Sequence, residues 1–381
     1  INAEVTQLVS ELDRFSTTTE FNGQKLFDGS FGSAAYQVGA NANQTITATT
    51  SNFRTNQYGT YQLGNQDARS SALATNSASG AVVSGGTAGS LVLNGAISTA
   101  TVAAAGNDSA KSLAQKINNA GTGIRADAKT DAIVTLSNHS FSLAVSGNGS
   151  ATINFTVSGG DLNAAVNAFN DKSGQTGVTA KLVNNNTALQ LTASDGSDIM
   201  VVDNGMASGA TLAVSGAGTL ASTGTYNTSG AGVRIGGQLT IDSDKAYSIQ
   251  ASGFAFGAGA IANGVAASGT AASGAALVAV NTLDVTTSAG ATNALRIVDS
   301  ALAAVNGQRA NFGALQSRFE ATIANLATTG ENLSASRSRI RDADFAAETA
   351  NLSRNQILQQ AGTAMLAQAN QLPQQVLSLL R

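Results

Sequence analysis

Residues 305–340 read VNGQRANFGALQSRFEATIANLATTGENLSASRSRI and carry an apolar side chain at every seventh position. These positions, here called the C-terminal stripe, are Val305, Phe312, Phe319, Leu326, Leu333 and Ile340. A strict period of seven is slightly shorter than two turns of a straight α-helix, so it keeps one stripe against a partner only when helices supercoil. The stretch therefore predicts a long helix that needs a partner helix.

The first residues of the chain offer that partner. An apolar stripe with alternating steps of four and three, the N-terminal stripe, consists of Ile1, Val5, Leu8, Leu12 and Phe15. This spacing is typical of one face of a helix, which we expect to end near residue 19. We expect the two stripes to pack together, so that the ends of the chain form a helical stalk and the middle is an insertion.

A third apolar stripe, the tail stripe, continues to the end of the chain through Leu358, Ala361, Met365, Ala369, Leu372, Val376 and Leu379. Asp342 and Asp344 suit the start of this last helix, and Pro373 should kink it or end its regular part. The opposite face carries Gln and Ser, so we expect both faces to be buried against copies of the chain. That density of glutamine is incompatible with hydrocarbon, so no membrane span is predicted.

The middle of the chain has few large side chains. Charged residues make up 11% of the sequence, with 41 Gly, one Pro and neither Trp nor Cys. This composition favours thin β layers, and the lack of Cys excludes disulfides and thiolate chemistry. The net charge of −3 without a basic block argues against nucleic acid, and the single histidine, His139, cannot form a histidine metal site. No cofactor is predicted.

Two segments of the middle resemble each other at an offset of about fifty residues. Residues 108–119 lead to Gly123-Ile124, and residues 161–170 lead to Gly177-Val178. Each predicts a short helix, opened by a capping Asp, that is followed by strands, so this is a duplicated αβ unit. Further on, residues 232–235 and 239–241 flank Gly236-Gly237 and predict a β-hairpin.

These patterns predict an α+β multidomain fold with a coiled-coil or bundle stalk and inserted β-rich outer domains. The stalk comprises residues 1–52 (helix plus hairpin), 293–341 and the C-terminal helix 342–381. The outer part spans 53–292, with the duplicated αβ unit at about 90–203 and an Ala/Gly-rich β part at about 204–292.

The sequence also offers residues for two other classes of function, an enzyme and a binding module. The carboxylate pairs Asp195/Asp198 and Asp242/Asp244 could perform acid–base chemistry or hold a cation. Both lie in turn-like runs where Asp caps backbone amides, and no nucleophile or histidine accompanies them, so no catalytic residue and no enzyme activity is predicted and cation binding stays open. The outer β domain could instead act as an adhesin that binds a host surface or glycan, although aromatic residues for stacking are scarce.

Several motifs at the two ends resemble bacterial flagellin, the subunit of the flagellar filament. They are residues 19–23 (TEFNG) and 38–41 (VGAN), then 311–319 (NFGALQSRF), 336–340 (SRSRI), 359–362 (QQAG), 367–370 (AQAN) and 379–381 (LLR). The resemblance implies a secreted, extracellular subunit that self-assembles through its terminal helices into the motility propeller. It also implies an export chaperone and a cap protein as partners. A hook–filament junction protein is the alternative within this class.

The family is also recognised by Toll-like receptor 5. Glu4, Val298 and Leu302 match its contact positions in type, while helix packing explains Val298 and Leu302 equally well. The family's N-terminal helices do not precede Ile1 in this sequence, so the resemblance implies a fragment that does not polymerise alone.

Overall fold

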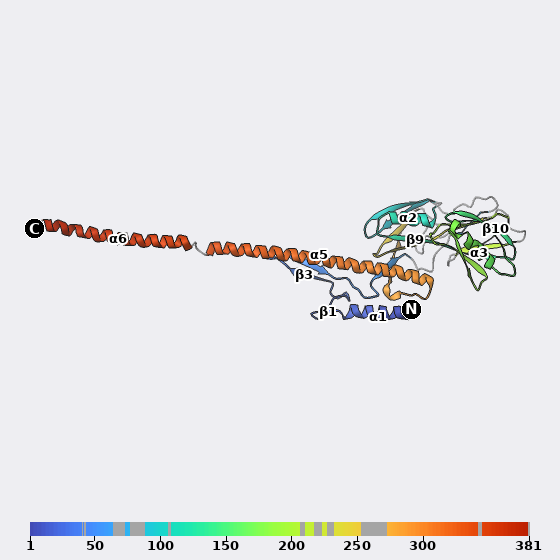
Figure 1. Ribbon diagram of the computed structural model, residues 1–381, viewed down its shortest axis with the longest axis horizontal. Coiled ribbons are helices and arrows are strands. Elements are labelled where there is room, and N and C mark those ends of the chain that lie inside the picture. The colour runs from blue at the N-terminus through green and yellow to red at the C-terminus, as the bar shows by residue number, and fades with distance from the viewer. Residues whose placement is uncertain are drawn as a thin grey trace. The chain divides into compact units, whose positions relative to one another are not determined.

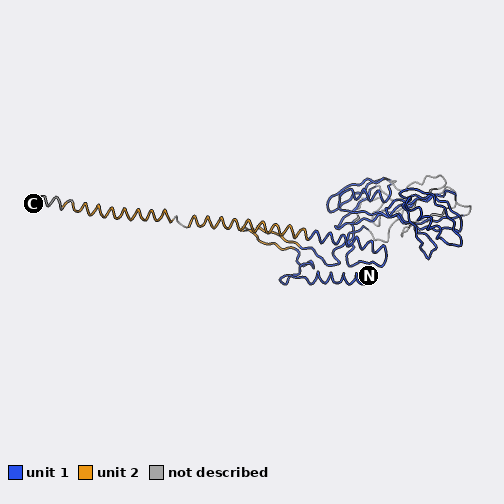
Figure 2. The backbone as a smooth tube through the Cα atoms, viewed as in Figure 1, with its two compact units in different colours: residues 1–32, 50–308 blue, residues 33–49, 309–381 orange. Residues whose placement is uncertain are grey.

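The computed structural model describes residues 1–39, 41, 43–63, 73–76, 88–105, 108–205, 210–216, 223–226, 232–252, 273–341 and 345–379. The chain forms two compact units, residues 1–32 with 50–308, and residues 33–49 with 309–381 (Figure 2). Most of the Ala/Gly-rich stretch after Ser252, and also Asp342 and Asp344, lie outside the described residues.

The chain begins with helix α1 (Asn2–Thr18) and a short hairpin of β1 (Glu20–Phe21) and β2 (Gln24–Lys25). The hairpin turn is Asn22-Gly23, with φ of 51° and 77°. Two successive positive φ values define the turn type that Asn-Gly favours. Both the helix and the turn are as the sequence predicts.

The duplicated unit is present in the structure. Its first copy consists of the hairpin β7 (Gly89–Asn94) and β8 (Thr99–Ala104), helix α2 (Ala110–Asn119) and strand β9 (Arg125–Leu136) (Figure 1). Its second copy consists of the hairpin β10 (Ser140–Ser146) and β11 (Ser150–Thr156), helices α3 (Asn163–Asp171) and α4 (Ser173–Thr176), and strand β12 (Thr179–Val183). Strand β13 (Ala188–Ala193) then pairs with β12.

The same side-chain contact fastens helix to strand in both copies. Asn118 donates its amide to the carbonyl of Ala126 at 2.9 Å and accepts from the Ala126 N–H at 2.8 Å. Asn170 does the same to Ala180, at 3.0 and 2.8 Å. Each Asn therefore satisfies two backbone groups of the strand after its helix, a repeat far more specific than the similarity of the two sequences.

Strand β9 belongs to both hydrophobic cores of this part. Its first half pairs with β18 (Gln238–Ser243), and its second half pairs with β13 and β15 (Leu212–Gly216). The sheet order is β12-β13-β9-β18-β5-β21, where β5 is Gly59–Gln62 and β21 is Ala276–Ala279, and β16 (Thr223–Tyr226) pairs with β15. The core on the α2 side includes Leu91, Leu113 and Ile117, and the core on the α3 side includes Leu143 and Phe169.

Two further sheets enclose these cores. One has the order β11-β10-β14-β17-β6, with β14 at Ile199–Asp203, β17 at Gly232–Ile235 and β6 at Leu73–Asn76. The other has the order β20-β19-β7-β8, with β19 at Ser248–Ser252 and β20 at Ser273–Gly274.

The hairpin predicted around Gly236-Gly237 is wrong. Strand β17 pairs with β14 and β6, whereas β18 pairs with β9 and β5, so the two strands belong to different sheets. Gly237 lies where this crossing is tightest, because an added Cβ would stand 2.6 Å from Thr130 Oγ1 and 2.7 Å from Ala110 Cβ. The glycines permit a crossover between sheets instead of a reversal.

The capping role predicted for Asp108 also needs correction. The N-cap of α2 is Ser109, whose side chain accepts a hydrogen bond from the Ser112 N–H. Asp108 accepts from the Ala105 N–H at 2.8 Å and from Lys116 Nζ at 2.5 Å, so it ties the preceding loop to the helix. Asp161 does act near the predicted place, because it accepts from the Asn163 N–H at 2.8 Å at the start of α3.

After β21 the chain passes through a short 3-10 turn, η1 (Val280–Thr282), into the long helix α5 (Ser288–Arg341) and then α6 (Phe345–Leu379). Pro373 lies inside α6 and does not end it. The second compact unit adds the hairpin of β3 (Ser33–Gln37) and β4 (Thr45–Thr49).

Candidate assembly surface

Helix α1 packs through a different face from the one predicted. Most of the predicted N-terminal stripe points outward: Leu8 is 67% and Phe15 60% exposed, and Ile1 and Leu12 are also exposed, whereas Val5 is partly buried. The inward face carries Val9, which packs on a cluster of Tyr58, Val280 and Ile297. The face through which α1 packs in its own unit is therefore not the predicted stripe, and the pairing of the two stripes stays a prediction.

Polar contacts hold this unexpected face in place. Asp13 accepts from both the N–H and the Oγ1 of Thr55 at 3.2 Å, and Asn2 Oδ1 accepts from the Val285 N–H at 3.1 Å. Ser16, on the same face, is buried. Because these bonds fix the helix orientation with little apolar burial, the larger side chains of α1 stay on the outside.

The start of α5 shows the same division into two faces. Ala294 and Ile297 are buried, and Gln308 accepts a hydrogen bond from Ser51 Oγ at 3.0 Å. The other face exposes Leu295, Val298 (40%) and Leu302 (55%). Since Glu4 is exposed as well, the three positions predicted to contact an innate receptor are all accessible in this unit.

In the second unit, the β3–β4 hairpin covers only a part of α5. Tyr36 of β3 contacts Phe319, and Phe312 and Phe319 are partly buried. The next members of the C-terminal stripe, Leu326, Leu333 (65%) and Ile340, are exposed. Val305, in the first unit, is partly buried.

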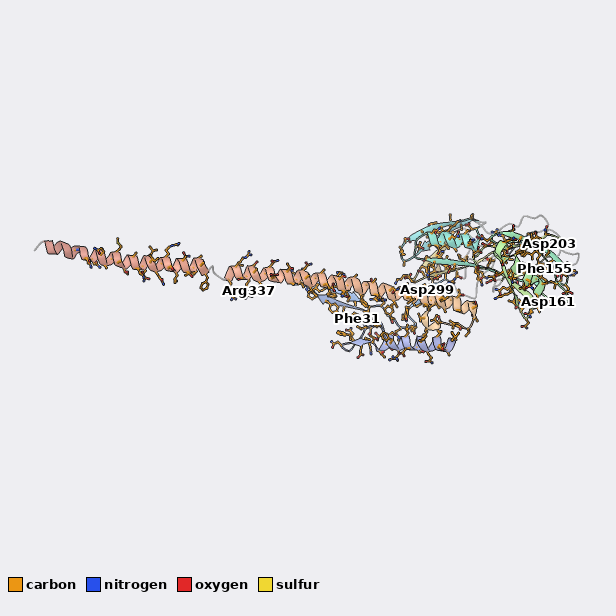
Figure 3. All side chains as sticks on the ribbon, in the orientation of Figure 1. Phe31, Phe155, Asp161, Asp203, Asp299 and Arg337 are labelled. Carbon is orange, nitrogen blue, oxygen red and sulfur yellow. The ribbon has the colours of Figure 1, made fainter. Side chains whose placement is uncertain are left out.

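Helix α6 is exposed along its whole described length (Figure 3). Its exposed large side chains are Phe345, Leu352, Ile357, Leu358, Met365 and Leu366, and the tail-stripe alanines Ala361 and Ala369 are exposed too. The side chains of Leu372, Val376 and Leu379 are not among those described. Glu348 and Arg354 are the charged residues of the helix, so most of this surface is apolar or amide. An isolated helix with such a surface is marginal in water and is stabilised by packing.

The helices of the described part are not sufficiently long and apolar to cross a bilayer.

Three of the four carboxylates in the two predicted pairs are engaged within the chain. Asp195 accepts from Lys111 Nζ at 2.8 Å and from the Ser197 N–H at 3.0 Å, while Asp198 accepts from Arg234 Nε at 2.6 Å. Asp242 is buried and bonds Arg125 at 2.9 Å, and Asp244 is partly exposed in the turn that follows. Within the described ranges, no group of three His, Asp or Glu side chains is arranged to hold a metal.

Burial raises the pKa of the Asp198 and Asp242 carboxyls, although Arg234 and Arg125 act in the opposite direction. The Asp195 carboxyl differs, because its hydrogen bonds with Lys111 and Ser197 outweigh burial and lower its pKa. These carboxylates act as structural ties between strands and helices.

An α+β fold with an inserted β-rich middle, and with long C-terminal helices that expose many apolar side chains, is the architecture of a structural subunit. The family model described as "Bacterial flagellin C-terminal helical region" matches residues 295–380. The B-type flagellin of Pseudomonas aeruginosa is 38% identical over 402 aligned residues, which cover all of this chain and 77% of that protein. The chain belongs to the flagellin family, and it is a structural subunit of the bacterial flagellar filament.

Other relatives match over shorter stretches. Flagellin A of Vibrio cholerae is 52% identical over 102 residues, 27% of each chain. The flagellin of Salmonella choleraesuis is 60% identical over 89 residues, 23% of this chain and 18% of that one. The solved structure of FliC from Burkholderia pseudomallei matches over 83% of both chains at 18% identity, with a TM-score of 0.28.

Proposed function

We propose that this subunit joins its neighbours in the filament through the exposed members of the C-terminal stripe and through the tail stripe on α6. The observation that carries the proposal is the exposure of α6: its described side chains from Phe345 to Gln371 are all exposed. A surface of this size and apolar character is typical of an interaction site. The N-terminal stripe residues Leu8, Leu12 and Phe15 belong to the same proposal, as a surface for further helices.

The test is filament growth in a flagellin-deficient strain of the bacterium that carries this gene. Met365→Asp places a charge on the tail stripe, and an unpaired charge buried between helices costs several kcal/mol. Met365→Leu keeps the apolar volume and serves as the matched control. We expect electron microscopy to show no filaments with the Asp variant and filaments of normal length with the Leu variant. Normal filaments from Met365→Asp would refute the role of this stripe.

The location and the helper proteins follow from filament membership. As a filament subunit the chain acts outside the cell, so it needs secretion, an export chaperone to keep its apolar helices soluble, and a cap protein where subunits are added. We propose no catalytic role for it.

Recognition by Toll-like receptor 5 is a second proposal, favoured by the accessible positions of Glu4, Val298 and Leu302. Val298 and Leu302 are four residues apart and so share one helix face. A reporter-cell assay with purified Leu302→Asp tests it. Loss of signalling with an unchanged melting temperature supports receptor contact, and unchanged signalling contradicts it.

A further inference from the structure

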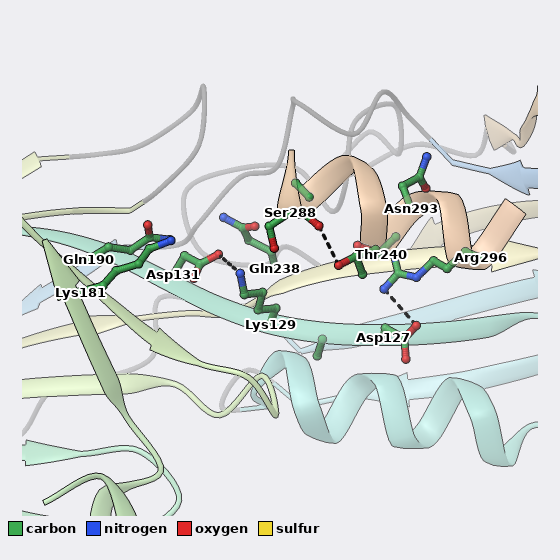
Figure 4. Close-up of a pocket in the computed structure, with 13 residues that line it drawn as sticks. Asp127, Lys129, Asp131, Lys181, Gln190, Gln238, Thr240, Ser288, Asn293 and Arg296 are labelled. Atoms are coloured by element: carbon green, nitrogen blue, oxygen red, sulfur yellow. Dashed lines mark hydrogen bonds and ion pairs between the residues drawn. The ribbon is translucent and has the colours of Figure 1, made fainter. Parts of the chain in front are cut away.

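A polar cavity of about 270 Å³ lies where the first turns of α5 meet the sheet of β9, β18, β12 and β13 (Figure 4). Ser288, Thr292, Asn293 and Arg296 line it from the helix, and the strands supply the rest of the wall. All of its lining residues belong to the unit formed by residues 1–32 and 50–308. The volume equals that of roughly nine water molecules, which is space for a ligand of monosaccharide size.

The charges around this cavity leave a positive excess. Arg296 pairs with Asp127 at 3.0 Å, and Lys129 pairs with Asp131 at 2.8 Å. Both carboxylates of the lining are therefore already matched by a cation. Lys181 is the fifth charged residue of the lining, and within the described part of the chain it has no ion-pair partner.

Lys181 lies beside an uncharged amide. It is the register partner of Gln190 across strands β12 and β13, and Figure 4 shows both side chains at the end of the cavity away from Arg296. Thr240 adds a hydroxyl to the lining, and Thr292 Oγ1, which donates to the Ser288 carbonyl at 3.0 Å, can still accept a hydrogen bond. Asn293 Oδ1 accepts from Gln62 Nε2 at 2.8 Å, which leaves the Asn293 amide hydrogens to donate.

The composition of this lining selects the chemistry of a ligand. None of the described lining residues is aromatic, so a flat ring would find no stacking partner. One free ammonium group favours one negative charge, and several neutral donors and acceptors favour hydroxyl groups. A ligand with a carboxylate and several hydroxyls meets both requirements.

We propose that this cavity binds a small hydroxylated carboxylate of the hexuronate class, with Lys181 neutralising the carboxylate and the Gln, Asn and Thr side chains bonding the hydroxyls. This site is separate from the filament surfaces, so its failure would leave the assembly proposal untouched. A compound of this size in a polar, open site binds with a dissociation constant on the order of 1 mM.

Lys181 has a simpler explanation that the test has to separate. Strand β12 is at the edge of its sheet, and edge strands often carry lysine to prevent pairing with another chain. A lysine with that purpose alone would not distinguish one anion from another. Selectivity for a hydroxylated carboxylate therefore decides between the two.

The experiment is saturation-transfer NMR on the full chain with three probes: D-glucuronate, D-glucose and acetate. We expect saturable binding of glucuronate, and at least tenfold weaker binding of glucose, which lacks the carboxylate, and of acetate, which lacks the hydroxyls. Lys181→Met should weaken glucuronate binding at least tenfold, while Lys172→Met, at an exposed lysine outside the cavity, should leave it unchanged. Methyl glucuronide separates two sources of the ligand. If the site takes a sugar acid at the end of a glycan chain, methyl glucuronide binds as tightly as glucuronate; if the site takes only the free acid, methyl glucuronide does not bind.

Two results would overturn the proposal. One is the absence of saturable binding at a glucuronate concentration of about 10 mM, which is roughly ten times the expected dissociation constant. The other is equal binding of glucuronate by Lys181→Met and wild type, with unchanged melting temperature in both.

Discussion

The ring of Tyr36 meets the ring of Phe319 edge to face, with centroids 5.8 Å apart and planes at 77°. Tyr36 belongs to the β3–β4 hairpin and Phe319 to α5, so residues almost three hundred positions apart share one contact in the second unit. A two-stranded hairpin is marginally stable alone, so it depends on such packing. Among the described residues of the second unit, this is the only ring-to-ring contact made by a member of the C-terminal stripe.

Tyr36→Ala should therefore release the hairpin from α5. An aromatic pair contributes about 0.5–1.5 kcal/mol beyond its buried area, so we expect residues 33–49 to exchange amide hydrogens about tenfold faster. Hydrogen exchange by mass spectrometry measures this, and Tyr36→Phe, which keeps the ring, is the control. Unchanged exchange in the Ala variant would show that the hairpin does not depend on Phe319.

The twin contacts of Asn118 and Asn170 lead to a second prediction. Asn118→Ala leaves the N–H and C=O of buried Ala126 without the side-chain amide, and Asn170→Ala does so for buried Ala180. Each variant should lose about 2–6 kcal/mol of unfolding free energy, because it leaves two backbone groups unsatisfied at a cost of about 1–3 kcal/mol each. Urea unfolding measures the loss. Asn154→Ala, at an exposed position of β11, is the control, and a loss no larger than in this control would contradict the prediction.

The duplication could be predicted from the sequence because its signals are local. A helix-forming stretch, a glycine turn and a strand recur at nearly the same spacing, and Asn118 and Asn170 lie in the matching segments. The Asn22-Gly23 turn was predictable for the same reason, since Asn-Gly accepts positive φ at both positions.

The structure differs from the sequence prediction where a sequence pattern does not specify which other part of the chain it packs against. Gly236-Gly237 indicates a change of direction, but only the packing against Thr130 and Ala110 shows that the chain crosses between sheets. The spacing of Leu8, Leu12 and Phe15 shows that α1 has an apolar face, but it cannot show that Asp13 and Asn2 hold the other face inward. The cavity beside Lys181 leaves no signal in the sequence, because its lining comes from four strands and a helix that are distant in sequence.

Asp242 gives a prediction about pH. Burial raises the pKa of its carboxyl, so the folded state binds a proton more tightly than the unfolded state, whose Asp pKa is about 3.9. The stabilising contribution of this residue is thus fully present below the unfolded pKa and is lost as pH rises through the folded pKa. Asp242→Asn stays neutral at every pH and cannot show that loss.

We therefore expect the stability of Asp242→Asn relative to wild type to increase between about pH 4 and pH 7. Arg125 tolerates the loss of its partner because its side chain is 53% exposed and stays hydrated. Urea unfolding at several pH values measures the difference. Asp244→Asn removes the same charge from a partly exposed neighbour and is the control. A relative stability that falls or stays constant with rising pH would show that Arg125 outweighs burial.

Leu333 separates folding from assembly. Its side chain is 65% exposed in this chain, so an aspartate there stays hydrated and should change the melting temperature by no more than about 2 °C, as surface substitutions do. In a filament the same carboxylate would be buried against a neighbouring helix at a cost of several kcal/mol. Leu333→Asp should thus abolish filament growth while the purified chain melts normally. Ala335→Asp, two residues further along the same exposed turn, points nearly the opposite way and should still permit filaments. Equal filament growth with both variants would show that the C-terminal stripe at Leu333 stays in water in the assembled flagellum.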